Sequence, residues 1–476
     1  MGQMTGEMKM GIVLNGGTIV TATDLYQADV RIEGERIVAI GYEIKQPGDQ
    51  VICVEGCFLF PGGVDPHTHF DLPMGTFSTS DDFLSGSKAA VLGGTTTILD
   101  FATQFKGETL KTGLKNWHAK ADGRCYVDYG FHMAITDWND QVAQEMTELV
   151  HQEGVPSFKL YMAYKNILQV DDGALLQALH QAGKCGALVC VHCENGDVVD
   201  YLVKEARGQG KTAPYFHPLT RPPEAEEEAT NRVITLAQIA EAPLYIVHLT
   251  CSGALRAVVK AKLKGLEVYA ETCPQYLLLD DSYYRSEGFN GAKYVISPPL
   301  RSVRHQERLW SGLRTGSLDT IATDHCAFNY KGQKDLGLSD FSKIPSGAPG
   351  VETRLALIYT YGVMTGKLSL NELVALTSTN AAKLFGLFPR KGTIAPGSDA
   401  DLVVWDPQAS STITVETLHQ QVDYTPYEGF AQKGQALHVF LRGKQVVKDG
   451  QLQVTTPTGI YLSRKPFLKR KVGGNV

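Results

Sequence analysis

The sequence has no run of 18 or more apolar residues, so it offers no segment of the length that crosses a membrane as a helix. Its 45 basic and 51 acidic side chains give a net charge of −6 without a basic stripe, so we expect no nucleic-acid partner. The first ten residues lack the apolar core of a signal peptide and the pattern for myristoylation. Nine cysteines at irregular spacings do not suggest a disulfide framework. These absences favour a cytoplasmic globular protein.

Both ends of the chain have the pattern of β-hairpins. Residues 11–57 contain short runs that alternate apolar and polar side chains, separated by Gly and Asn. The same pattern returns after residue 392. Because two β-rich segments can pair although they lie far apart in the sequence, we predict a small β-sandwich domain from residues 1–59 plus 390–476.

The middle of the chain alternates strand-like and helix-like segments. Apolar segments rich in β-branched residues recur at eight places: 58–69, 95–101, 125–136, 157–163, 187–194, 244–250, 266–274 and 320–325. Helix-like stretches such as 171–183, 224–241 and 252–264 separate several of them. Eight strands with crossover helices predict an α/β fold, a (β/α)8 TIM-like barrel over residues 60–389. The polar segment 326–350 follows the eighth strand and is a candidate substrate loop.

Metal-binding residue types end strand after strand of this barrel, at the face where barrel active sites form. They are His67, His69, Lys159, His192, His248 and Asp324. His67 and His69 are two residues apart, so in a strand they point to the same side. Lys159 lies in the apolar strand SFKLYMA, where an unpaired ammonium is costly and requires a carboxylate partner or a chemical change. A single histidine is often only a hydrogen-bonded core residue, but the full set of strand ends indicates a metal site.

Several motifs resemble the amidohydrolase superfamily and, within it, the hydantoinases and dihydropyrimidinases. They are DPHTH at the barrel start, SFKLYMAY, VHLT, TDH and the closing GTIAPGSDADLVVWD. The resemblance implies two divalent metal ions bridged by Lys159 after its carboxylation by CO2. It places one ion on His67, His69 and Asp324 and the other on His192 and His248. Imidazole and carboxylate ligands suit zinc, with manganese or cobalt as replacements.

The resemblance also implies a reaction, which is the opening of a cyclic amide ring to an N-carbamoyl amino acid by a metal-bridging hydroxide. Asp324 takes the proton of the hydroxide and returns it to the departing ring nitrogen. Tyr164, in the loop beyond the fourth strand, resembles the family tyrosine that donates to the oxyanion. Ser297 matches a serine whose backbone binds the ring amide, whereas Ser346 stands where the family has an asparagine.

The residues after the second histidine separate related activities. Asp71 occupies the position of the arginine that binds the substrate carboxylate in dihydroorotases, which disfavours that reaction. Asp71-Leu72-Pro73 also matches the Asn-Glu-Pro of allantoinases poorly. Five apolar residues are candidates for the wall of the substrate pocket, although core packing explains them equally well: Leu72, Met74, Phe77, Tyr161 and Leu168.

Two alternatives remain at this stage, an allantoinase and a non-catalytic scaffold resembling the collapsin-response mediator proteins. The scaffold proteins have lost metal ligands, whereas all six ligand positions are filled here. The family resemblance also implies a homotetramer. We therefore expect a zinc-dependent cyclic amidohydrolase that acts on a small hydantoin or dihydropyrimidine.

Overall fold

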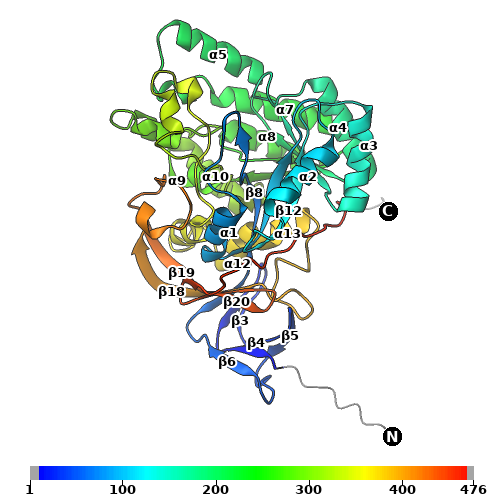
Figure 1. Cartoon of the computed structure of the whole chain (residues 1–476), viewed down its shortest axis with the longest axis vertical. Coiled ribbons are helices and arrows are strands. Elements are labelled where there is room, and N and C mark those ends of the chain that lie inside the picture. The colour runs from blue at the N-terminus through cyan, green and yellow to red at the C-terminus, as the bar shows by residue number, and fades with distance from the viewer. Residues whose placement is uncertain (1–9, 469–476) are drawn as a thin grey trace.

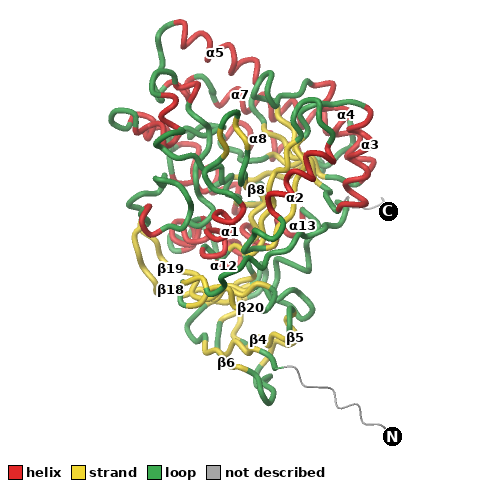
Figure 2. The backbone as a smooth tube through the Cα atoms, viewed as in Figure 1, coloured by secondary structure: helices red, strands yellow, loops and turns green. Residues whose placement is uncertain are grey.

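The structure is a computed structural model that describes residues 10–468. It consists of a large α/β body with a β-rich part at one end (Figures 1 and 2). None of the helices in this described range is both long and apolar enough to span a bilayer. The expectation about a signal peptide concerns the first ten residues, of which residues 1–9 lie outside the described range.

The body contains eight parallel strands that pair in chain order, as the sequence predicts. They are β8 (Gly63–Thr68), β11 (Thr95–Thr103), β12 (Asp128–Ala134), β13 (Ser157–Tyr161), β14 (Leu188–His192), β15 (Leu244–Ile246), β16 (Val268–Thr272) and β17 (Thr320–Ile321). Thr68 and His325 bridge the first strand to the segment after the last, which closes the ring. All residues of these strands are buried, because side chains fill the interior and helices cover the outside. The fold class is confirmed.

Helices surround this barrel. The longer ones are α1 (Phe83–Leu92), α2 (Leu110–Ala121), α3 (Asp140–Glu148), α4 (Asp172–Cys185), α5 (Gly196–Gly208), α7 (Pro223–Ile239), α8 (Ser252–Leu263) and α10 (Arg304–Arg314). The short ones are α6 (Phe216–Leu219), α9 (Pro274–Leu278), α11 (Arg354–Ile358), α12 (Leu370–Val374) and α13 (Asn380–Leu384). Helices α4, α7 and α8 correspond to the three stretches predicted from the sequence.

Two further sheets stack at the β-rich end. One contains β1 (Ile12–Asn15), β4 (Asp29–Glu33), β5 (Arg36–Gly41) and β6 (Gln50–Cys53). The other contains β2 (Thr18–Val20), β3 (Leu25–Gln27), β7 (Phe58–Pro61), β18 (Leu402–Thr412), β19 (Ala431–Leu441), β20 (Lys444–Lys448) and β21 (Gln451–Leu452). Side chains from both sheets, including Leu14, Leu59 and Phe440, share one apolar core. The predicted sandwich of N- and C-terminal segments is therefore present.

The first predicted barrel strand is in fact two strands. β7 pairs with β18 in the sandwich, and only β8 belongs to the barrel. The division falls at Gly62, where a Cβ atom would lie 2.0 Å from the Thr96 hydroxyl. A side chain does not fit there, so the backbone passes from one sheet to the other at a glycine.

A buried ion cluster joins the barrel to the sandwich. The Lys391 ammonium lies 2.6 Å from a carboxylate oxygen of Asp128 on β12 and 2.6 Å from one of Asp401, which precedes β18. Asp399 is 3.0 Å away. Burial opposes the charged lysine, but these carboxylates outweigh it and raise its pKa. Charge pairing therefore compensates for the desolvation of this junction.

Candidate metal centre

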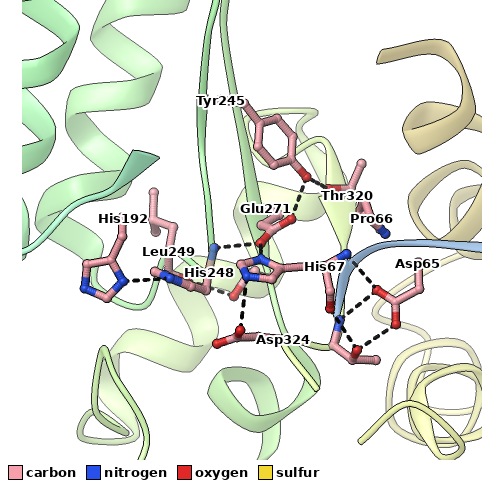
Figure 3. Close-up of polar contacts among 12 residues, drawn as sticks. Asp65, Pro66, His67, His192, Tyr245, His248, Leu249, Glu271, Thr320 and Asp324 are labelled. Carbon is pink, nitrogen blue, oxygen red and sulfur yellow. Dashed lines mark hydrogen bonds and ion pairs between the residues drawn. The ribbon is translucent and has the colours of Figure 1, made fainter. Parts of the chain in front are cut away.

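Five of the six predicted ligand residues lie at one end of the barrel, at or just beyond the ends of their strands, and the sixth, Lys159, lies in the middle of β13. Figure 3 shows four of them, His67, His192, His248 and Asp324, converging from separate strands. They occupy the carboxyl-terminal face of a parallel barrel, which is where the loops can bind a substrate.

The first cluster consists of His67, His69 and Asp324. The two histidine Nε2 atoms are 3.2 Å apart, and Asp324 Oδ1 lies 3.1 Å and 3.3 Å from them. His67 is fully buried, and the side chains of His69 and Asp324 are only 10% and 14% exposed. Two imidazole nitrogens and a carboxylate oxygen directed at one point fit a divalent cation.

The second cluster pairs His192 with His248. His192 Nδ1 and His248 Nε2 are 3.0 Å apart. The ring of His248 lies 5.4 Å from that of His67, measured between centroids, so the two clusters are neighbours. Two facing imidazole nitrogens offer a second cation two ligands beside the first site.

Lys159 is buried at the base of these clusters. Its ammonium lies 4.7 Å above the ring centroid of Phe101, and the same ring packs against His67 and His69 at 4.6 Å and 5.0 Å. Within residues 10–468, no carboxylate lies within ion-pair distance of the Lys159 ammonium. Burial lowers the pKa of this lysine. The carboxylate partner considered from the sequence is therefore absent from the described structure.

Glu271, which the sequence analysis missed, orients the first cluster. Its carboxylate, on β16, pairs with His67 Nδ1, accepts a hydrogen bond from Tyr245 Oη at 2.7 Å and accepts another from the His248 amide at 3.0 Å. Burial alone opposes the charged form of His67, but Glu271 and Asp324 raise the pKa of that histidine to about 9. The pairing leaves Nε2 of His67 directed at Asp324. A carboxylate within the apolar strand VYAET was the available signal.

Glu194 has the same role at the second cluster. Its carboxylate lies 2.7 Å from His192 Nε2 and 2.8 Å from the Arg221 guanidinium. Burial alone would raise the pKa of Glu194, but Arg221 and His192 hold it below its usual range. A carboxylate that fixes the orientation of a ligating imidazole is a common feature of metal sites. Its signal in the sequence was its position two residues after His192.

Three site residues have left-handed backbone conformations. The φ angles are 38° at His248, 52° at Asp324 and 66° at Tyr164. Residues other than glycine seldom adopt such angles, and strained backbone of this kind clusters at functional sites. The strain places these side chains over the end of the barrel immediately after their strands.

Tyr164, Ser297 and Ser346 lie close together beside the second cluster. The Tyr164 ring is 5.0 Å from that of His192, and Ser297 Oγ donates a hydrogen bond to Ser346 Oγ at 3.2 Å. Burial raises the pKa of Tyr164, while the Arg221 guanidinium and the neighbouring Ser297 hydroxyl oppose the rise. The structure thus joins the predicted oxyanion donor to both predicted amide-binding residues.

The five predicted wall residues fall into two segments. Leu72, Met74 and Phe77 belong to the hairpin of β9 (Pro73–Met74) and β10 (Phe77–Ser78). Leu72 packs against the barrel core, whereas Met74 is 41% exposed. Tyr161 and Leu168 flank the turn after β13, and the Tyr161 ring lies 6.0 Å from that of Tyr164. The wall therefore stays a prediction, and core packing stays the alternative, in particular for the buried Tyr161 and for Leu72.

Comparisons with known proteins agree with this geometry. The model of the amidohydrolase family matches residues 58–446. A D-hydantoinase from Geobacillus stearothermophilus is 50% identical over 96% of this chain and 97% of its own length. The crystal structure of a dihydropyrimidinase from Brevibacillus agri is 50% identical in sequence and has a TM-score of 0.95. The match covers 97% of this chain and 100% of that chain. The structure of an L-hydantoinase from Arthrobacter aurescens is 27% identical in sequence and has a TM-score of 0.87. That match covers 96% of this chain and 100% of that chain. The chain belongs to the amidohydrolase family, in its hydantoinase and dihydropyrimidinase branch.

Proposed function

We propose that the protein is a cyclic amidohydrolase that opens hydantoin or dihydropyrimidine rings to N-carbamoyl amino acids. The observation that carries the proposal is the convergence of His67, His69 and Asp324 beside the His192–His248 pair. The relatives named above are hydantoinases and a dihydropyrimidinase, which supports this substrate class.

Divalent metal ions follow from the family and from the ligand cluster, and zinc suits the donor set. His67, His69 and Asp324 would hold one ion, and His192 and His248 would hold the other. Bound ions of this kind supply Lewis-acid polarisation of a carbonyl and lower the pKa of water to about 7.

Lys159 would be shared by both ions as a carbamate. Its neutral amine forms a bond to the carbon of CO2 and releases one proton, so the product is an anion with two ligand oxygens. Its burial beside both clusters, without a carboxylate partner, supports this modification. The carbamate removes an uncompensated cation from the protein interior.

The chain's own residues carry the proton and the developing charge. Asp324 accepts the proton of the attacking water and delivers it to the ring nitrogen as the amide bond breaks. Tyr164 donates its hydroxyl hydrogen to the carbonyl oxygen, where negative charge develops. The Ser297 and Ser346 segments bind the ring amide and hold the scissile bond in place.

The exocyclic substituent of the ring contacts the apolar wall of Leu72, Met74, Phe77, Tyr161 and Leu168. We assign D stereoselectivity, because the D-hydantoinase named above is 50% identical in sequence to this chain and the L-hydantoinase is 27% identical.

We also propose that the protein is a homotetramer in the cytoplasm. All nine cysteines are free and seven of them are buried, which is typical of a reducing compartment.

One assay tests the function. The purified protein is supplied with dihydrouracil, with each enantiomer of a 5-substituted hydantoin and with allantoin, and its metal content is measured. We expect turnover of the first two substrate classes, preference for the D-enantiomer and zinc close to two per chain. Preferred turnover of allantoin would establish the allantoinase instead. A chain without turnover and without stoichiometric metal would be a scaffold.

A further inference from the structure

Lys334 is a buried lysine that the proposed mechanism does not use. It lies in the 326–350 segment, at the start of a short 3-10 turn (Lys334–Gly337), and its side chain is inaccessible to solvent. Its ammonium donates hydrogen bonds to the backbone carbonyls of Val295 at 3.0 Å and Pro345 at 2.9 Å. Within residues 10–468 these two carbonyls are its hydrogen-bond partners, and neither carries a negative charge.

Burying the Lys334 ammonium costs free energy of folding, so stability does not explain why a lysine stands at this position. Burial lowers the pKa of this lysine to about 7, and the one titratable side chain that opposes the shift is the Cys326 thiol. Within residues 10–468, no carboxylate lies within ion-pair distance of its ammonium. An apolar side chain of similar length would avoid this desolvation.

The two carbonyls belong to the two segments that we assign to the ring amide. Val295 lies two residues before Ser297, and Pro345 directly precedes Ser346. The Val295 carbonyl also accepts the Gly347 amide at 3.0 Å. Lys334 therefore bridges the backbones on which the Ser297–Ser346 contact of 3.2 Å depends.

Other side chains fix the first segment to the barrel but do not join it to the second. His217 Nε2 donates to the Ile296 carbonyl at 2.7 Å, and Tyr276 Oη donates to the Pro298 carbonyl at 2.9 Å. Between the two segments the described contacts are the Lys334 bridge, the Gly347 amide and the serine pair. The Gly347 amide and the serine pair join the two segments directly, whereas Lys334 lies outside both segments and binds to each of them.

We propose that Lys334 is a positioning residue, whose ammonium sets the spacing between the Ser297 and Ser346 segments and thereby the affinity for the ring amide. The inference rests on the proposed function, because it presupposes that these segments bind a cyclic amide. It assigns to the 326–350 segment a specific contribution to substrate binding. Lys334 itself need not touch the substrate.

The test uses Lys334→Met, which keeps the length and removes both donors. Lys331→Met and Lys343→Met are matched controls, because both lysines lie in the same segment and are exposed. For a 5-substituted hydantoin we expect KM to rise about 10-fold, which corresponds to about 1.4 kcal/mol of binding free energy, because the two segments lose the bridge that sets their spacing. We expect kcat to stay within about threefold and metal content to stay unchanged.

A purely structural role would reduce the melting temperature without this separation of KM from kcat. A folded Lys334→Met enzyme with the KM of the controls would overturn the proposal. If Lys334→Met does not fold, Lys334→Gln, which keeps a donor for one carbonyl, should give an intermediate KM, and a wild-type KM would overturn the proposal equally. A wild-type enzyme that opens no cyclic amide would refute the proposed function itself, so the two failures are distinct.

Discussion

Glu194 and His192 form a buried hydrogen bond of 2.7 Å between the carboxylate and ring Nε2. Because Glu194 also pairs with Arg221, it remains ionised and accepts the Nε2 hydrogen. The other ring nitrogen, Nδ1, then keeps its lone pair and faces His248. The second cluster is therefore set for metal binding by a residue that is not itself a ligand.

Glu194→Gln should weaken the binding of the second metal ion by about 10–100-fold, the usual cost of losing such a partner. The first ion, on a cluster oriented by Glu271, should be retained. Titration of the metal-stripped protein with zinc measures both affinities. Glu205→Gln, an exposed position on α5, is the control. Equal affinities in the two variants would contradict the role of Glu194.

Lys159 should carry one CO2 in the native, metal-loaded protein, which native mass spectrometry detects as an addition to the sequence mass. Lys159→Ala should lose metal and activity, with partial recovery when short-chain carboxylic acids are added. Exposed Lys184→Ala should change neither. An unmodified Lys159 in a fully metallated, active preparation would refute the bridging assignment.

Tyr164→Phe should lower kcat by about 10²–10³-fold, the usual cost of removing one donor to a developing oxyanion. Metal content should not change, because the hydroxyl is not among the proposed ligands. The Tyr161→Phe variant is a matched comparison on the neighbouring ring. Near-normal kcat in Tyr164→Phe would assign the donation to another group.

The sequence predicted that the six candidate ligands would meet at one face of the barrel, because the fold brings residues with the same place on parallel strands together. His67 lies in β8 and His69 directly follows it. The other four candidate ligands lie in or just after parallel strands whose carboxyl ends meet at the same face. Glu271 and Lys334 were not predicted, since their importance depends on pairings with His67, Val295 and Pro345 that lie far away in the sequence. The sequence also could not locate the division between β7 and β8, because it follows from packing against Thr96.

The stability of the protein should depend on pH through Lys334. Burial lowers its pKa to about 7 in the folded state, whereas an unfolded lysine has a pKa of about 10.4. Between these values the unfolded chain binds more protons, so the free energy of unfolding rises with pH. Lys334→Met lacks this group. The difference in melting temperature, wild type minus Lys334→Met, should therefore be more positive at pH 9 than at pH 6, and a constant difference would contradict the burial of a titrating lysine.

Asp324 combines two proposed functions, as a ligand of the first metal ion and as the proton shuttle. Burial favours its neutral form, but His67 and His69 outweigh burial and hold the pKa of Asp324 well below its usual range. It is consequently a weak base at rest. It can still accept a proton from the attacking water, because that water becomes more acidic as its oxygen bonds to the ring carbon, and the departing nitrogen then recovers the proton.

His325 cannot easily replace it. Its Nε2 lies 3.0 Å from Asp81, and its Nδ1 accepts the amides of Gly350 at 3.1 Å and Val351 at 3.2 Å. Both nitrogens of this fully buried ring are thus occupied away from the metal ligands. The histidine next to Asp324 is therefore engaged in structural contacts.

Asp324→Asn keeps the size of the side chain and one ligand oxygen but removes the proton acceptor. We expect kcat to fall by about 10²–10⁴-fold from the loss of general base catalysis, with the ion on His192 and His248 largely retained. Metal analysis and steady-state kinetics, with exposed Asp172→Asn as the control, separate the two functions. Because both ring nitrogens of His325 are occupied, this residue does not act as a substitute base. Adding His325→Gln to Asp324→Asn should therefore remove no further base catalysis. An Asp324→Asn enzyme with both metals and near-normal kcat would show that the proton travels by another route.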